Sequence, residues 1–297
     1  MQIVESTGKK IWRVVYPILL YFLISNVVAI AATLLFAIIY INSMTSVGAD
    51  FDQVVKGLTD GSLGMFVRYT NYITAASVII SFPFIMRFIR RDAERFEAEG
   101  IYHPYEHPKW LDYLVAAAAG AAACLALNNM IVMSGLYNVS TQYEQVAEAL
   151  YQGNLVVEIL IIGIIVPAFE ELLFRELVQQ RIRAYWGVPA SIFVTAALFG
   201  IFHMNLPQGI YAFCLGLLLS FAREKYHTVL APILMHAAAN VLSVIVSETS
   251  FNPLGVFNQT GKRFYFVTGF CCILVILGFA YMFYRMNLKE KDNTAQP

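Results

Sequence analysis

The sequence has few charged residues. Only 13% of its 297 residues are Asp, Glu, Lys or Arg, whereas 59% are hydrophobic, and the mean hydropathy is +0.62. Soluble domains carry about 25% charged residues, so this composition excludes an ordinary soluble fold. Acidic and basic residues are equal in number, which gives a formal net charge of zero. Without a basic surplus there is no electrostatic basis for a nucleic-acid partner.

Cysteine is also scarce. The sequence has four cysteines, all within apolar segments: Cys124, Cys214, Cys271 and Cys272. Their spacing is neither that of a metal knuckle nor that of a disulfide framework, so we interpret them as small buried hydrophobic residues. The first apolar run is too long for the core of a signal peptide, and we therefore expect no cleaved targeting segment.

Long apolar segments, in contrast, are abundant. Several run for about 20 residues, enough to cross a hydrocarbon core about 30 Å thick. We therefore predict an all-α, polytopic membrane protein with about eight transmembrane helices, near Tyr16–Ile41, Phe66–Phe88, Leu111–Ser134, Asn154–Phe174, Val188–His203, Gln208–Phe221, Thr228–Val246 and Phe264–Tyr284. The fifth and sixth of these are short, so a re-entrant pair is the alternative to two full crossings. The fourth is expected to continue as a helix to Gly187.

Basic residues predict the orientation. When eight spans are counted, sixteen of the twenty Lys and Arg fall on one side of the membrane, and only Lys56, Arg68, Lys262 and Arg263 fall on the other. Cytoplasmic loops are rich in Lys and Arg, so both termini are predicted to be cytoplasmic. The compact chain with short loops is typical of a prokaryotic cell membrane protein.

A pair of carboxylates interrupts one of the most apolar regions, in PAFEELLFRE, residues 167–176. Glu171 and Arg175 are four residues apart on a helix and can form an ion pair. Glu170 is rotated by about 100° and is not committed to that pair. Burial favours its protonated form and the nearby arginine favours its carboxylate, a balance that suits a general base. An ordinary charge cluster at a helix end is the alternative interpretation.

Two later segments place polar side chains on single helix faces. LFGIFHMN and LMHAAANVL contain pairs spaced by four residues, namely Phe199 with His203 and His236 with Asn240. A helical hairpin turning at Trp186–Gly187 would bring His203 level with Glu170. Single histidines in membrane helices often only bond a neighbouring helix, but a free acid, two imidazoles and an amide together indicate a site. Glu158, by contrast, is expected to be solvated at the outer interface.

The three motifs together resemble a known family. EELLFR fits the pattern EExxxR, FGIFH fits FxxxH, and HAAAN fits HxxxN, in this order and in apolar segments. This arrangement resembles the CAAX protease and bacteriocin-processing enzyme family of intramembrane endopeptidases, also called the Abi family. The similar region runs from about Asn154 to Val246. The first three predicted spans carry no motif of this kind.

The resemblance implies a fold, an activity and residue roles. It implies an eight-helix fold with a cavity open towards the cytoplasm, and a domain organisation with N-terminal membrane helices and connectors at 1–150, a catalytic core at 151–250, and a last helix and cytoplasmic tail at 251–297. Glu170 is implied as the base that activates water with His203, and His236 and Asn240 as the oxyanion stabilisers. The implied supporting residues are Glu171, Arg175 and Phe199.

Hydrolysis of an amide is compatible with these residues, because it needs a deprotonated water, a proton for the leaving amine and donors for the oxyanion. A zinc site formed by Glu170, His203 and His236 is the alternative within the same reaction. The HExxH signature is absent, and we favour the metal-free mechanism, without a cofactor. His103 and His107 are also four apart, but the prolines that follow them disfavour a shared helical face and a metal site.

The expected partners are the lipid bilayer and a peptide or protein substrate at the membrane, which the resemblance implies to be prenylated CAAX proteins in eukaryotes and peptides or other proteins in prokaryotes. A non-catalytic membrane scaffold and a transporter are the alternative functions. A transporter is disfavoured because no inverted repeat or matched pair of broken helices is evident.

Overall fold

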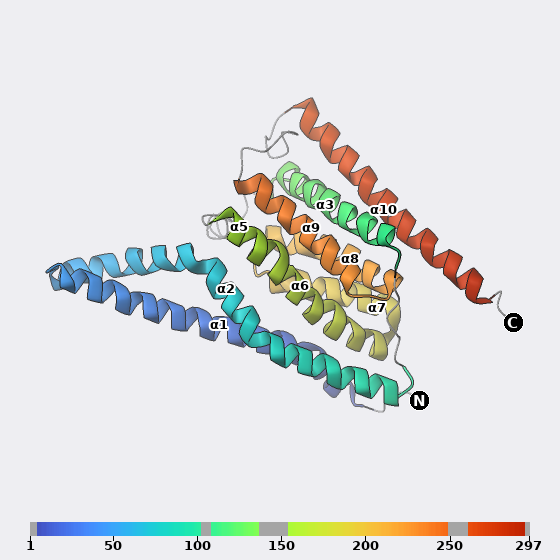
Figure 1. Cartoon of the computed structure of the whole chain (residues 1–297), viewed down its shortest axis with the longest axis horizontal. Coiled ribbons are helices and arrows are strands. Elements are labelled where there is room, and N and C mark those ends of the chain that lie inside the picture. The colour runs from blue at the N-terminus through green and yellow to red at the C-terminus, as the bar shows by residue number, and fades with distance from the viewer. Residues whose placement is uncertain (1–4, 102–107, 137–153, 249–260, 295–297) are drawn as a thin grey trace.

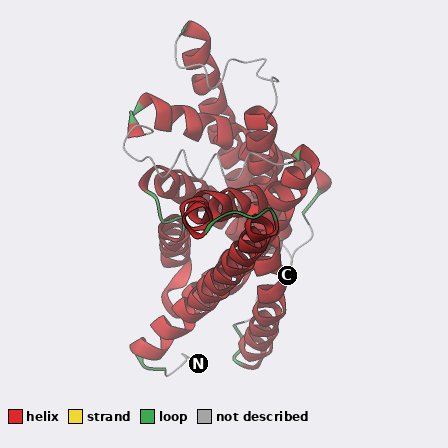
Figure 2. Ribbon diagram, turned by 90° about the vertical axis from the view of Figure 1, so that its left-hand side faces the viewer, coloured by secondary structure: helices red, strands yellow, loops and turns green. Residues whose placement is uncertain are grey.

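The computed structural model describes residues 5–101, 108–136, 154–248 and 261–294. These residues form helices and connecting loops, with no strand among them (Figure 2). The helices are α1 (Thr7–Ser46), α2 (Phe51–Ala98), α3 (Trp110–Met133), α5 (Leu155–Glu158), α6 (Val166–Glu171), α7 (Gln179–Phe202), α8 (Leu206–Tyr226), α9 (Leu230–Glu248) and α10 (Lys262–Thr294), with π-helical segments at Ile159–Ile165 and Leu172–Val178. The predicted all-α class is confirmed.

Six described helices are long and apolar enough to cross a membrane. They are Thr7–Ser46, Phe66–Ala98, Trp110–Met133, Leu206–Tyr226, Leu230–Glu248 and Lys262–Arg285. The other two predicted spans, 154–174 and 188–203, lie in the helical stretch from α5 to α7, which is divided by the π-helical segments. Both chain termini lie towards the same end of the molecule (Figure 1). The count of eight and the cytoplasmic side of that end stay predictions.

The turn predicted at Trp186–Gly187 is present. Gly187 has φ 83° and ψ 178°, which are non-helical angles within α7. A positive φ of this size is accessible to glycine at little cost and is strained for other residues. The chain therefore reverses here, and the ring of Phe174 contacts those of Phe199 and Phe202, at centroid distances of 5.1 and 5.7 Å. The two arms of the hairpin thus pack against each other at the level of the predicted site.

Small residues allow α3 to approach α9 closely. The α3 sequence WLDYLVAAAAGAAACLALNNMIVM is rich in alanine, and small residues are typical of tightly packed helices in membranes. A Cβ atom added to Gly120 would lie 1.9 Å from the carbonyl oxygen of Met235, so only glycine fits at this contact. Met235 directly precedes His236, and the contact therefore fixes the height of that part of α9.

The α1–α2 hairpin differs from the rest of the molecule. The part of this hairpin around its turn extends away from the other helices in Figure 1, drawn in blue and cyan. In the most apolar window of α1 none of the residues is buried within the protein, compared with 56% in α3. Along most of its length α1 therefore presents apolar side chains to its surroundings, as expected of a helix in contact with lipid.

Two predictions about individual residues, one for Glu158 and one for the cysteines, can be compared with the structure. Glu158 is fully buried, with 0% exposure, so the prediction that it is solvated at the outer interface was wrong. The four cysteines are free; Cys124 and Cys271 are buried, and the other two are partly exposed.

Some predictions lie outside the described residues. They concern His103, His107 and the domain boundaries at 150/151 and 250/251. The division into domains therefore stays a prediction.

Candidate active site

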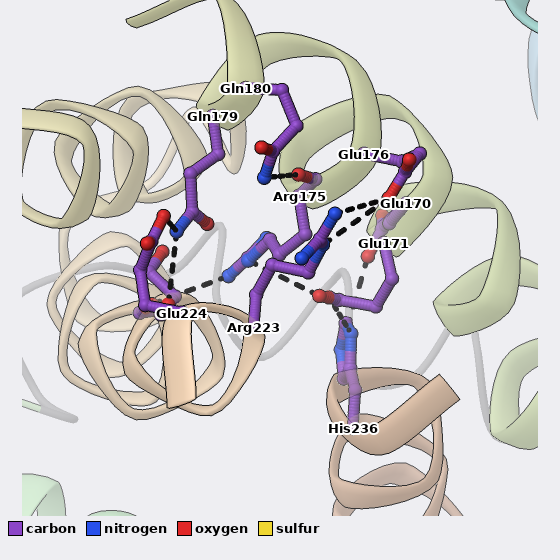
Figure 3. A network of polar contacts seen from close by, with 11 residues as sticks. Glu170, Glu171, Arg175, Glu176, Gln179, Gln180, Arg223, Glu224 and His236 are labelled. Atoms are coloured by element: carbon purple, nitrogen blue, oxygen red, sulfur yellow. Dashed lines mark hydrogen bonds and ion pairs between the residues drawn. The ribbon is translucent and has the colours of Figure 1, made fainter. Parts of the chain in front are cut away.

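A buried cluster of charged side chains lies where α6 faces α9 (Figure 3). Glu170 and Glu171 end α6, Arg175 lies on the π-helical segment that follows, and His236 lies on α9. All four are less than 10% exposed. Buried charges are costly unless they are paired, so the contacts among these four groups determine what the cluster can do.

Glu171 is the most firmly held acid of the cluster. One of its carboxylate oxygens lies 3.2 Å from Nε of Arg175, and both side chains are completely buried. The ion pair predicted from their spacing is therefore confirmed. Its other oxygen accepts a hydrogen bond from Nδ1 of His236 at 2.8 Å, a contact that the sequence did not predict. Glu171 thus joins the cationic arginine on its own helix to the imidazole on α9.

Glu170 is held more loosely. Within the described residues its carboxylate has a single ion-pair contact, with Nε2 of His236 at 3.9 Å. This distance is too long for a hydrogen bond. Glu170 also retains 9% exposure, while Glu171 has none. The two imidazole nitrogens of His236 therefore face two different acids, one hydrogen-bonded and one held apart.

His203 directly follows the last residue of α7, one helical turn beyond Phe199. Its Nδ1 lies 2.8 Å from the carbonyl oxygen of Phe199, and because a carbonyl only accepts, Nδ1 carries the hydrogen. This leaves the Nε2 lone pair available. The Phe199 ring meets both imidazoles edge to face, at centroid distances of 4.8 Å for His203 and 5.7 Å for His236.

Phe199 has a second role in the packing. The guanidinium carbon of Arg175 lies 4.4 Å from the centre of the Phe199 ring, a cation–π contact within the protein interior. Phe199 is only 1% exposed. The residue therefore contacts the arginine and both histidines, which accounts for an aromatic side chain four residues before His203.

Asn240 is placed differently from the other predicted site residues. It lies one turn beyond His236 on α9, and its Nδ2 donates a hydrogen bond to the carbonyl oxygen of Ile162 at 3.1 Å. Ile162 belongs to the first π-helical segment. The amide has two N–H bonds, so this contact orients the side chain and uses one of its donors.

Two π-helical segments flank α6, at Ile159–Ile165 and Leu172–Val178. π-helical turns are rare and are frequent at functional sites. Here they lie on either side of the Glu170–Glu171 pair. The first supplies the carbonyl that binds Asn240, and the second carries Arg175. Sequence analysis did not predict them, because their signal is a shift in the hydrogen-bond register rather than a residue type.

Tyr21 of α1 is a neighbour of the cluster that sequence analysis missed. It is 5% exposed, and its ring packs on Phe169 and Phe202, with centroid distances of 4.8 and 5.6 Å. These two phenylalanines directly precede Glu170 and His203. Tyr21 also interacts electrostatically with Glu170. A tyrosine in an apolar helix carries no distinctive motif, so only the fold identifies it.

Polar contacts continue from the cluster along α8, where it faces the second π-helical segment and the beginning of α7 (Figure 3). Glu176 binds Arg223 of α8 at 3.1 Å, and the amide of Gln179 donates to the carbonyl of Ser220 and to Glu224. Arg183 also pairs with Glu224, at 2.9 Å. These contacts fix the helix that carries the Glu170–Glu171 pair against α8.

The zinc alternative requires three ligating side chains that converge on one point. Across the described ranges, no group of three or more His, Cys, Asp or Glu side chains is arranged to hold a metal ion. The hydrogen bonds from Nδ1 of His236 to Glu171 and from Nδ1 of His203 to a backbone carbonyl are compatible with either mechanism, because zinc-bound histidines also donate their second nitrogen in this way. The choice of the metal-free mechanism therefore stays a prediction.

Comparison with known proteins bears on the same segment. Residues 152–242 match a family model described as type II CAAX prenyl endopeptidase Rce1-like. The match includes all seven predicted site residues and confirms the family resemblance, and the family is one of proteases. No curated protein and no solved structure matches the chain.

Proposed function

We propose that the protein is an intramembrane endopeptidase that hydrolyses peptide bonds of membrane-associated or hydrophobic peptides, with Glu170 as the base. The unequal contacts of the two acids carry this proposal. Glu171 is bound by Arg175 and His236, whereas Glu170 has one long contact at 3.9 Å. A buried ionisable group in a membrane protein is paired or functional, so the loosely held acid is the one available for chemistry. The match to an endopeptidase family supports the same reaction.

The proposed reaction begins with a water molecule between Glu170 and His203. The Glu170 carboxylate removes a proton from this water, and Nε2 of His203 accepts the other hydrogen of the same water in a hydrogen bond. The resulting hydroxide attacks the carbonyl carbon of the substrate and forms a tetrahedral oxyanion. As the C–N bond breaks, Glu170 returns its proton to the leaving amine. The products are a carboxylic acid and an amine, and Glu170 is regenerated.

His236 and Asn240 are proposed to stabilise the oxyanion. The hydrogen bond from Nδ1 of His236 to Glu171 orients the ring so that Nε2 is directed to the side of Glu170. A proton on Nε2 would make His236 a cation, and the four groups Glu170, Glu171, Arg175 and His236 would then have zero net charge. The second N–H of Asn240 supplies the other donor. Donors of this kind contribute about 10²–10³-fold to the rate of acyl transfer.

The orientation of the site follows from the basic residues. The end of the molecule that holds both termini is predicted to be cytoplasmic, and we propose that the site is reached from that side, as the family resemblance implies. The substrates would then be peptides, or the ends of proteins, that lie at the inner surface of a prokaryotic cell membrane.

The proposal is tested by comparing native peptides in membranes that contain the wild-type protein, Glu170→Gln or Glu97→Gln. Glu97 is exposed near the end of α2 and serves as a matched control. We expect specific cleavage products with the wild type and with Glu97→Gln, and their loss with Glu170→Gln at equal protein levels. Products that persist with Glu170→Gln would contradict the assigned base. A membrane scaffold would yield no products from any of the three, while still recruiting its partner.

A further inference from the structure

A second polar cavity lies at the end of the molecule where the chain begins. It has a volume of about 260 Å³ and lies between the first turns of α1, the last turns of α2 and the beginning of α7. Its walls are formed by Arg13, Tyr16, Phe88, Arg91, Asp92, Arg95 and Arg181. The cavity is separate from the proposed active site, because it shares none of its residues.

The charges of this cavity are unbalanced. Four of its lining residues are arginines, and Asp92 is the only acid among them. Asp92 forms an ion pair with Arg181, which neutralises both. Two acids lie beside the cavity: Glu5 binds Arg13 at 2.8 Å, and Glu99 lies 3.8 Å from Arg95. Positive charge remains on Arg91, which is exposed, and is only weakly compensated on Arg95.

Arg181 is the residue of α7 that lines the cavity. It is 2% exposed and donates hydrogen bonds to Asp92, to the carbonyl of Arg13 and to the hydroxyl of Tyr16. Its guanidinium also lies over the Tyr16 ring, 5.0 Å from the ring centre. Arg181 therefore ties α7 to both α1 and α2. Its hydrogen bonds are committed to the protein, so it shapes the cavity and leaves ligand contacts to other arginines.

Two nitrogens of the Arg95 guanidinium have no hydrogen-bond partner among the described residues. One terminal nitrogen donates to the hydroxyl of Tyr185 at 3.1 Å. Its Nε and its other terminal nitrogen are buried without a hydrogen-bond partner among the described residues, and the contact with Glu99 at 3.8 Å is too long to satisfy Nε. Buried donors without partners are rare in proteins and require an explanation. The rings of Phe96 and Tyr185 lie 4.8 and 5.7 Å from the guanidinium carbon, and an anion bound in the adjoining cavity would supply the hydrogen-bond acceptors that these rings do not.

We propose that this cavity binds an anionic phosphate group through Arg95 and Arg91. The planar guanidinium fork matches the geometry of phosphate oxygens. At the predicted cytoplasmic surface two sources present such a group, namely the headgroup of an anionic phospholipid and free phosphate, and basic pockets between helices on that side are known to receive headgroups. The inference rests on this cavity and not on the hydrolytic activity.

Binding here would have a structural consequence. A ligand held by α2 next to Arg181 would strengthen the contact between the α1–α2 hairpin and the helix that leads to Glu170. The ligand should therefore stabilise the folded protein, since a molecule that binds only the native state raises its stability.

The test uses the full-length protein in phosphatidylcholine vesicles in a phosphate-free buffer. Thermal unfolding is measured in these vesicles alone, with added phosphatidylglycerol, and with added inorganic phosphate. Wild type is compared with Arg95→Gln, with Arg95→Lys, which keeps the charge but not the fork, and with Arg90→Gln. Arg90 is exposed on the same helix but does not line the cavity, so its variant controls for net charge.

We expect the midpoint of wild type and Arg90→Gln to rise with phosphatidylglycerol or with phosphate, and the rise to be lost in Arg95→Gln and reduced in Arg95→Lys. A rise with phosphatidylglycerol alone identifies a lipid headgroup, and a rise with inorganic phosphate identifies free phosphate. If Arg95→Gln does not fold, the proposal is tested by comparing the rise of the unfolding midpoint in Arg95→Lys with the rise in Arg90→Gln. No rise in wild type with either probe, or equal rises in the Arg95 and Arg90 variants, would overturn the proposal.

Discussion

The two charged regions of the molecule differ in how their charges are balanced. In the cluster at α6 and α9, two acids face Arg175 and His236, and only Glu170 is loosely held. In the cavity at the beginning of α1, arginines outnumber acids, and the spare donors belong to Arg95. Deep in the protein a charge needs a partner within hydrogen-bonding distance, whereas near the membrane surface an excess of positive charge is tolerated. In the outer region the proposed ligand would bind N–H donors of Arg95 that lack partners, and in the inner region the proposed reaction uses Glu170, the acid with the longer ion-pair contact.

The largest effect on the charged cluster at α6 and α9 is expected when Glu171 is removed. We expect Glu171→Ala to destabilise the folded protein by about 3–5 kcal/mol, because a buried Arg175 is left without its partner. Activity should fall with it, since His236 also loses the acceptor for Nδ1. Thermal unfolding in detergent micelles measures the effect.

Glu176→Ala is the matched control for that variant. Its carboxylate pairs with Arg223, and the two side chains keep 12% and 7% exposure. A smaller loss of stability is therefore expected. Equal losses for the two variants would show that the inner ion pair has no special importance.

Asn240 tests whether the inner region is arranged for catalysis. We expect Asn240→Ala to lower kcat by about 10²–10³-fold, because an oxyanion donor is removed. The free energy of unfolding should fall by only about 1 kcal/mol for the lost bond to Ile162. Asn128→Ala removes a similar bond to a backbone carbonyl, that of Cys124 on α3, and should leave kcat unchanged. A similar loss of kcat in both variants would indicate a structural role for Asn240.

Tyr21 tests whether α1 contributes to the site. Tyr21→Phe keeps the ring packed on Phe169 and Phe202 and removes the hydroxyl near Glu170. We expect a decrease of a few-fold in kcat/KM and a changed pH profile of the reaction, because the surroundings of the base are altered. Tyr69→Phe, on the exposed part of α2, should have no effect. An unchanged pH profile in Tyr21→Phe would limit Tyr21 to packing.

The smallest expected effect is that of metal removal. In the proposed mechanism Glu170 activates water without a metal, so cleavage by the purified protein should continue in the presence of a strong chelator. The measurement is the cleavage rate before and after chelation, and after addition of zinc. Loss of activity that zinc restores would favour the zinc alternative instead.

Much of this arrangement could be predicted from helical spacing. The pair of Glu171 and Arg175 follows from residues four apart, and the reversal at Gly187 follows from a breaker between two apolar runs. Both are local features, in which the sequence determines the geometry directly. The family resemblance added predicted roles for the histidines and for Asn240, which spacing alone left open and which stay proposals.

Contacts between distant segments could not be predicted in this way. The bond from Asn240 to Ile162 depends on a π-helical register that packing between helices determines. Tyr21 packs on Phe169 and Phe202, next to Glu170 and His203 in the sequence, from a helix without any motif. Glu158 was assigned to the interface from its position near the beginning of a span, yet it is buried, because local hydropathy does not report which face a neighbouring helix covers.

The central claim is that the loosely held acid performs the chemistry, and its most direct test is the cleavage rate of purified Glu170→Gln on a substrate of the wild-type protein. The side chains are equal in size, so the folded protein should keep the unfolding midpoint of the wild type. The account predicts a rate lower by about 10²–10⁴-fold, the usual contribution of a general acid–base. Wild-type cleavage by folded Glu170→Gln would contradict it.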